Sequence, residues 1–119
     1  MAGRGFLPTG EAARRNKPTI PTTHLPASGR TVPAPECPCV LGPAGARWWA
    51  WAWTTAQSAA WSDGDAYFVA RRGQLEDEEQ TATVVREMNN MDDRLGLSPK
   101  GLAMLRWKIV ADDDLPPAA

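Results

Sequence analysis

The side chains best suited to chemistry in this chain are one histidine and two cysteines, all of them before residue 40. His24, Cys37 and Cys39 supply three possible metal ligands. Zinc sites usually separate paired cysteines by about two to four residues and complete the tetrahedron with further ligands. Here one proline separates the cysteines and no second pair follows. Two reduced thiols in a loop are the better interpretation, so we predict no metal site.

Catalytic chemistry has little support in the sequence. The densest set of carboxylates is the acidic run Glu76–Glu79, but such runs usually form the solvated face of a helix, and no base stands near it. Arg71 and Arg72 precede this run, and we expect them to form ion pairs along a helix. The chain also lacks a P-loop, a GxGxxG turn and a GxSxG motif. We therefore predict that the protein is not an enzyme and uses no cofactor.

Basic residues offer phosphate contacts, and they are unevenly distributed. Residues 1–43 carry a net charge of +3, and residues 44–119 carry a net charge of −4. The first group of candidate DNA-binding residues lies near the N-terminus and comprises Arg4, Arg14, Arg15 and Lys17. Cations on a mobile segment contact phosphates without sequence preference. A solubilising tail is an equally good interpretation of this composition.

A second basic group lies near the C-terminus. Lys100, Arg106 and Lys108 occur in residues 98–111, a stretch without any acid. Together with an exposed Trp107, they would form a surface for DNA or for a partner protein. The simpler alternative is an amphipathic helix with ordinary solvated lysines.

Proline marks the boundaries of the elements that must position these residues. Eight of the 11 prolines precede residue 44, two close the chain, and only Pro99 lies between. We predict a disordered or extended, basic, proline-rich arm at 1–43, a helical domain at 44–111 and an acidic tail at 112–119. The predicted fold class is all-α, with three to four helices, one of them long.

Four of the six tryptophans fall in RWWAWAWTTAQ, residues 47–57. Alternation of Trp49, Trp51 and Trp53 fits a strand, but over residues 47–60 most tryptophans and alanines share one side of a helix. Because alanine favours helix, we predict a helix whose tryptophans anchor the core. Trp51 lies at the edge of this stripe and is a candidate for a subunit interface.

The next segment, residues 62–95, has helical composition between a good N-cap, Ser62, and a good C-terminal stop, Gly96. Phe68 and Leu75 share one side, whereas the later apolar residues share nearly the opposite side. One long helix that changes its buried face needs two partners, and one of them would be another subunit. Phe68 and Leu75 are therefore further interface candidates.

A break in this segment is an equally good interpretation. Gly73 or the pair Asn89–Asn90 would divide it into two shorter helices. The sequence does not decide between one helix and two.

A last helix is predicted to begin after Ser98, which caps it, with Pro99 at the first helical position. Leu102, Leu105 and Ile109 would form its buried stripe. Trp107 would face elsewhere, which makes it another interface candidate. The chain shows neither a long apolar run nor a signal-peptide pattern, so we expect no membrane association.

Several stretches, in the same order along most of the chain, resemble one known family. They are MAGRG with ARRNK, VPAPE, WWAWAWTTAQSAAW, AYFVARRGQLED and MDDRLGLSPKGLAMLRWKIV. The chain resembles the small subunit of the phage DNA-packaging terminase, especially versions from actinobacterial phages and prophages. The tryptophan block and the RLGLSPKG–LRW block are the most specific; the basic arm is generic.

The resemblance implies a non-catalytic adaptor in the bacterial host cytoplasm. Small terminase subunits assemble into rings of identical helical subunits, recognise double-stranded viral DNA, and recruit and regulate a large subunit with ATPase and nuclease activity. The segment from Leu95 to Pro99 corresponds to the family's junction between helices. Two other classes stay open: a dimeric helix-turn-helix transcriptional regulator, and a protein-only scaffold whose arm never contacts DNA.

Overall fold

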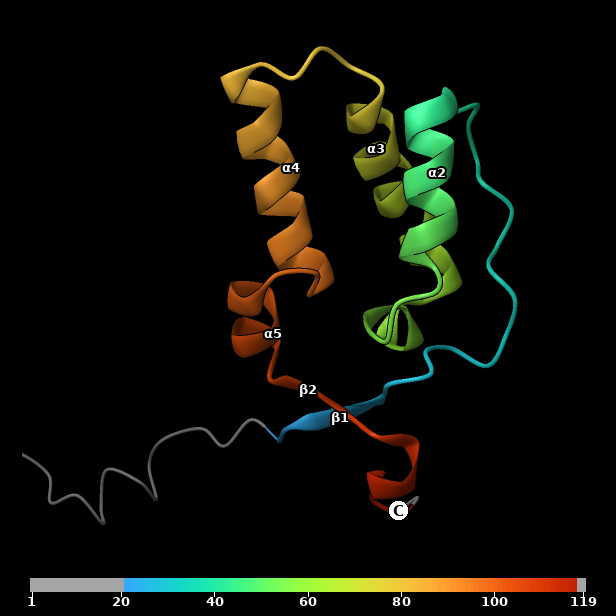
Figure 1. The fold of residues 1–119 in the computed structure, drawn as a ribbon, viewed down its shortest axis with the longest axis vertical. Coiled ribbons are helices and arrows are strands. Elements are labelled where there is room, and N and C mark those ends of the chain that lie inside the picture. The colour runs from blue at the N-terminus through green and yellow to red at the C-terminus, as the bar shows by residue number, and fades with distance from the viewer. Residues whose placement is uncertain (1–20, 118–119) are drawn as a thin grey trace, which may run out of the picture.

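The computed structural model describes residues 21–117. Within this range the chain forms four α-helices and one small parallel sheet (Figure 1). The elements, in order, are β1 (Thr23–Pro26), α2 (Pro43–Ala52), α3 (Ala66–Glu76), α4 (Ala82–Leu95), α5 (Pro99–Leu105) and β2 (Trp107–Val110), with short 3-10 turns at Gln57–Ala60, Asp63–Asp65 and Asp112–Asp114. The all-α prediction therefore holds for the helical majority, and the sheet corrects it.

The tryptophan block forms α2, but this helix is shorter at its C-terminal end than predicted. It begins at Pro43, and it ends at Ala52 instead of continuing to residue 60. The hydroxyl groups of Thr54 and Thr55 donate to the carbonyls of Trp51 and Ala52 at 2.6 and 2.8 Å. Threonine side chains that satisfy the last carbonyls of a helix compete with its continuation, so the chain turns here.

Most of the tryptophans anchor the core, as predicted. Trp53 and Trp61 pack edge to face, with ring centroids 5.1 Å apart, and Trp49 lies 5.4 Å from Trp53. The buried cluster adds Val69 of α3 and Leu95 of α4, so it joins three helices. Trp61 also donates from its indole nitrogen to the carbonyl oxygen of Leu95 at 3.0 Å.

The segment 62–95 forms two helices, and neither of the predicted break points is used. Gly73 lies inside α3, where it faces Gly45 of α2. A Cβ atom on Gly45 would lie 2.6 Å from the Gly73 carbonyl oxygen, so the missing side chain permits close packing of α2 on α3. The break falls at residues 77–81, where the Thr81 hydroxyl accepts from the Val84 amide and caps α4. No long helix is present among the described residues.

The predicted last helix is also divided. Ser98 caps α5 by accepting from the Gly101 amide at 2.9 Å, and Pro99 occupies the first turn, as expected. The helix ends at Leu105, and Ile109 lies 40% exposed in β2 instead of in a buried helical stripe. The β-branched and aromatic residues of this segment suit a strand, and β1 supplies its hydrogen-bonding partner.

The sheet joins two segments that are far apart in the sequence. Strand β1 runs parallel to β2, with Thr23 opposite Trp107 and Pro26 opposite Val110. It lies below the helices in Figure 1, next to β2, and residues 27–42 return along the outside of α2. Part of the predicted arm is thus a strand, whereas residues 1–20 lie outside the described range.

Candidate nucleic-acid interface

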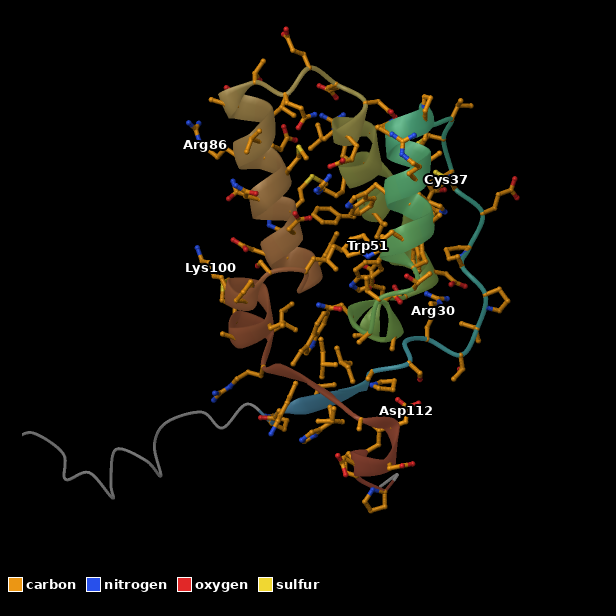
Figure 2. The ribbon with its side chains drawn as sticks, viewed as in Figure 1. Arg30, Cys37, Trp51, Arg86, Lys100 and Asp112 are labelled. Carbon is orange, nitrogen blue, oxygen red and sulfur yellow. The ribbon has the colours of Figure 1, made fainter. Side chains whose placement is uncertain are left out.

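The candidate interface is the α5–β2 end of the molecule, which we call the basic end and define by Lys100, Arg106 and Lys108. Lys100 is 73% exposed in the first turn of α5 and points away from the helices (Figure 2). Its ammonium nitrogen lies 3.9 Å from the Asp93 carboxylate, a long contact that leaves Lys100 largely in solvent. Arg106 and Lys108 are exposed as well.

The turn from α5 into β2 depends on Arg106. This residue adopts φ +61°, the left-handed conformation that ends many helices, and it is the only such non-glycine residue in the described part of the chain. The Arg106 carbonyl oxygen accepts from the Thr23 amide at 2.8 Å, so the same turn begins the sheet. The backbone therefore fixes where the Arg106 side chain leaves the surface.

Parallel pairing brings the attachment point of the basic arm to this end. His24 stands opposite Lys108 in the sheet register, and opposite residues of a parallel pair face the same side. The chain preceding β1 carries Arg14, Arg15 and Lys17 only a few residues before Thr23. The described chain therefore begins next to the basic end, at the sheet.

The position of Trp107 links the basic end to the core. Its ring packs over Gly96, where a Cβ atom would approach it to 2.5 Å. Gly96 has φ +75° and ends α4, as predicted. Gly96 thus accommodates both the positive φ and the indole ring, and Trp107 holds the start of β2 against α4.

Other basic side chains have structural roles. Arg72 is buried, donates to Asp92 and to Glu76 at 2.8 Å each, and stacks over Trp48 with its guanidinium carbon 4.7 Å from the ring centroid. Although burial lowers the pKa of Arg72, the hydrogen bonds that it donates to these carboxylates raise its pKa overall. Arg72 and Glu76 form the ion pair along a helix that was predicted, whereas Arg71 makes longer contacts with Glu78 of the connection and Glu87 of α4.

The predicted site residues have different positions. Arg4, Arg14, Arg15 and Lys17 lie outside the described residues. The interface candidates differ in exposure: Trp51 is 52% exposed, Phe68 and Trp107 are half-buried, and Leu75 is 1% exposed. Leu75 is therefore a core residue and a wrong choice for a subunit contact, because its side chain has no surface to offer.

Sequence reasoning missed the position of His24 beside Lys108 at the basic end. His24 reaches the basic end through a strand pairing that spans 84 residues, and no local pattern signals such a pairing. Cys37 and Cys39 are free thiols whose sulfur atoms lie 3.8 Å apart. Within residues 21–117 no three metal-ligating side chains gather at one place.

Comparison with protein families decides the family of the chain. The family model described as phage terminase small subunit matches residues 3–119. The chain belongs to the phage terminase small subunit family. No curated protein and no solved structure matches the chain significantly. The described helices of this terminase small subunit include none that is long and apolar enough to cross a membrane.

Proposed function

We propose that this terminase small subunit is the non-catalytic DNA-recognition adaptor of the packaging machinery. Several copies assemble into a ring, as the family resemblance implies, and the assembly binds double-stranded viral DNA in the host cytoplasm. The assembly recruits and regulates the large subunit that holds the ATPase and nuclease activities. The family match supports this role, and the observation that carries the DNA-binding part is the pairing of β1 with β2.

That pairing gives each copy two sets of cations for phosphate. The exposed Lys100, Arg106 and Lys108 form one set on the fold, and Arg4, Arg14, Arg15 and Lys17 form a second set in the sequence before β1, which pairs with β2. A single set of exposed cations binds DNA weakly at physiological salt. In an assembly, the sets of all copies act at high effective concentration, so weak contacts add up to useful avidity.

Salt-dependent DNA binding tests the proposal. The logarithm of the binding constant falls with the logarithm of salt concentration by about 0.9 per phosphate contact. A triple variant with glutamine at Lys100, Arg106 and Lys108 should therefore reduce the slope by up to about 3 per copy bound. The matched control is Arg86→Gln, which removes an exposed cation of α4 outside the basic end (Figure 2).

Fluorescence anisotropy with a labelled duplex measures the slope for each variant. A wild-type protein that does not bind duplex DNA at low salt contradicts the proposed function. If the triple variant binds DNA with an unchanged salt dependence, the DNA contacts are assigned to the arm instead. A variant with glutamine at Arg14, Arg15 and Lys17 then tests that assignment.

A further inference from the structure

Two adjoining hollows lie on the side of the molecule formed by α3 and α4. The first, of about 320 Å³, is lined mainly by Trp61, Phe68 and Trp107, and its charged residues are Arg94 and Asp65. The second, of about 290 Å³, shares Phe68 and Arg94 and adds Met91, with Arg71, Glu87 and Asn90 as its other polar residues. We call the two together the α3–α4 groove. Their volumes fall near the lower end of the range for ligand pockets, about 300–1,000 Å³, which suits an anchoring side chain and its neighbours.

The groove has one cation without a partner. Arg71, at its rim, lies within 3.7–3.9 Å of Glu78 and Glu87. Arg94, in contrast, forms no ion pair within residues 21–117 and lines both hollows. An aromatic hollow with an unpaired arginine at its edge fits a ligand that carries an apolar side chain beside a carboxylate, with the carboxylate meeting Arg94 on the side away from Asp65.

The C-terminal tail of the chain has this chemistry. Three aspartates, Asp112–Asp114, are followed by Leu115 and two prolines, and this whole segment is exposed. Leu115 has φ −66° and ψ 136°, the polyproline conformation, as expected for a residue before proline. Asp112–Asp114 form a 3-10 turn, and Leu115 continues from it in an extended conformation, so the end of the tail loses little entropy when it binds in a groove.

The tail cannot easily reach the groove of its own molecule. Trp107 lines the first hollow, but β2 leads away from it, and Asp112 accepts from the backbone amide of Ser28 at 3.1 Å. In Figure 1 the C-terminal segment lies beyond the sheet, on the far side from α4. The tail is thus directed outward from the molecule.

We propose that the α3–α4 groove receives the C-terminal tail of a second copy. Leu115 of one copy fills the aromatic hollow, and Asp113 or Asp114 pairs with Arg94. Because the groove and the tail are different surfaces, the contact is head to tail, and repetition gives a closed ring or an open filament. The proposal rests on the assembly in the proposed function but does not depend on DNA contact.

Duplex DNA and the chain's own arm fit the groove less well. A base enters an aromatic pocket of this kind only after it leaves the stack, which costs a few kcal/mol. The arm is basic, so it would bring like charge to Arg94. The acidic tail brings the opposite charge.

Light scattering on a sizing column tests the contact in the full chain. Wild-type protein should form an oligomer, and both Leu115→Asp and Arg94→Glu should reduce its mass. Val40→Asp and Arg86→Glu are matched controls, because both residues are exposed and lie outside the groove. A variant that combines Arg94→Glu with arginine at Asp113 and Asp114 should regain the wild-type mass.

A peptide measurement keeps the test valid if a variant folds poorly. A labelled peptide of residues 111–119 should bind the full-length Leu115→Asp protein, whose groove is free, and should bind at least tenfold more weakly when the peptide carries Leu115→Ser. A monomeric wild type, an unchanged mass in both groove and tail variants, or equal binding of both peptides overturns the proposal. Weaker DNA binding by Arg94→Glu at unchanged mass assigns the groove to DNA instead. An oligomer that depends on the tail but fails to bind DNA leaves this inference intact and refutes the proposed function.

Discussion

Asp77 caps α2 from outside that helix, and its replacement should destabilise the fold. The N-cap of α2 is Gly42, which has no side chain to offer. The two oxygens of the Asp77 carboxylate instead accept from the amides of Gly42 and Gly45 at 2.8 and 2.9 Å. Loss of an N-cap costs about 1 kcal/mol, with a range of roughly 0.5–2. Loss of a carboxylate at a helix N-terminus costs about 0.3–1 kcal/mol more, discounted for exposure.

Asp77→Ala should therefore lower the free energy of unfolding by about 1–2 kcal/mol. For a domain of this size that corresponds to a fall in Tm of roughly 4–16 °C. Thermal unfolding followed by circular dichroism measures it, with the exposed Glu79→Ala in the same loop as control. Asp77→Asn, which keeps one acceptor oxygen and loses the charge, should fall between the two. If Asp77→Ala and Glu79→Ala have the same Tm, the capping argument is refuted.

Three further changes have expected outcomes. Gly45→Ala should lower the stability by about 1–3 kcal/mol, because its Cβ meets the backbone of α3, whereas the exposed Gly64→Ala should change the urea midpoint little. Hydrogen bonds from Ser28 lower the pKa of Asp112, so this contact stabilises the fold above the ordinary aspartate pKa, and the stabilisation is lost as the pH falls through the lowered pKa. An NMR titration of the Asp112 carboxyl group should show the lowered pKa, and Ser28→Ala should raise that pKa. Trp51→Ala should reduce the oligomer mass more than the Tm, because the ring is half in solvent; an unchanged mass with a lower Tm would count against an interface role.

Local sequence chemistry predicted the helix ends that depend on neighbouring residues. Ser98 with Pro99 begins α5, and Gly96 ends α4 in the left-handed conformation. Each of these signals acts within one turn, so it is readable without knowledge of the fold. The core role of the tryptophans was also readable, because helical periodicity places most of them together.

Long-range contacts decided the elements that were predicted wrongly. The α3–α4 break depends on Asp77, which leaves the helical pattern to cap α2 more than thirty residues earlier in the chain. The strand at Trp107–Val110 depends on β1, and the helical stripe assumed there ignored this partner. Leu75 was assigned to an interface because its two-faced helix lacked a second partner, whereas the short α3 buries it within the chain.

The net charge of −1 is a poor guide to partners, because the folded chain separates its charges. The acidic residues Glu76–Glu79 lie at the α3–α4 connection, at one end of the molecule, and the basic end lies at the other, next to the sheet (Figure 1). The aspartates Asp112–Asp114 follow β2 and lie near the sheet as well. A polyanion is repelled from both acidic groups, so its attraction to the basic end depends on the local orientation of Lys100, Arg106 and Lys108. Pairing with β1 fixes the orientation of β2 and hence of Lys108. The same residues with β1 unpaired would keep their net charge but lose this orientation, so variants that break β1–β2 pairing should weaken DNA binding without removing a single cation.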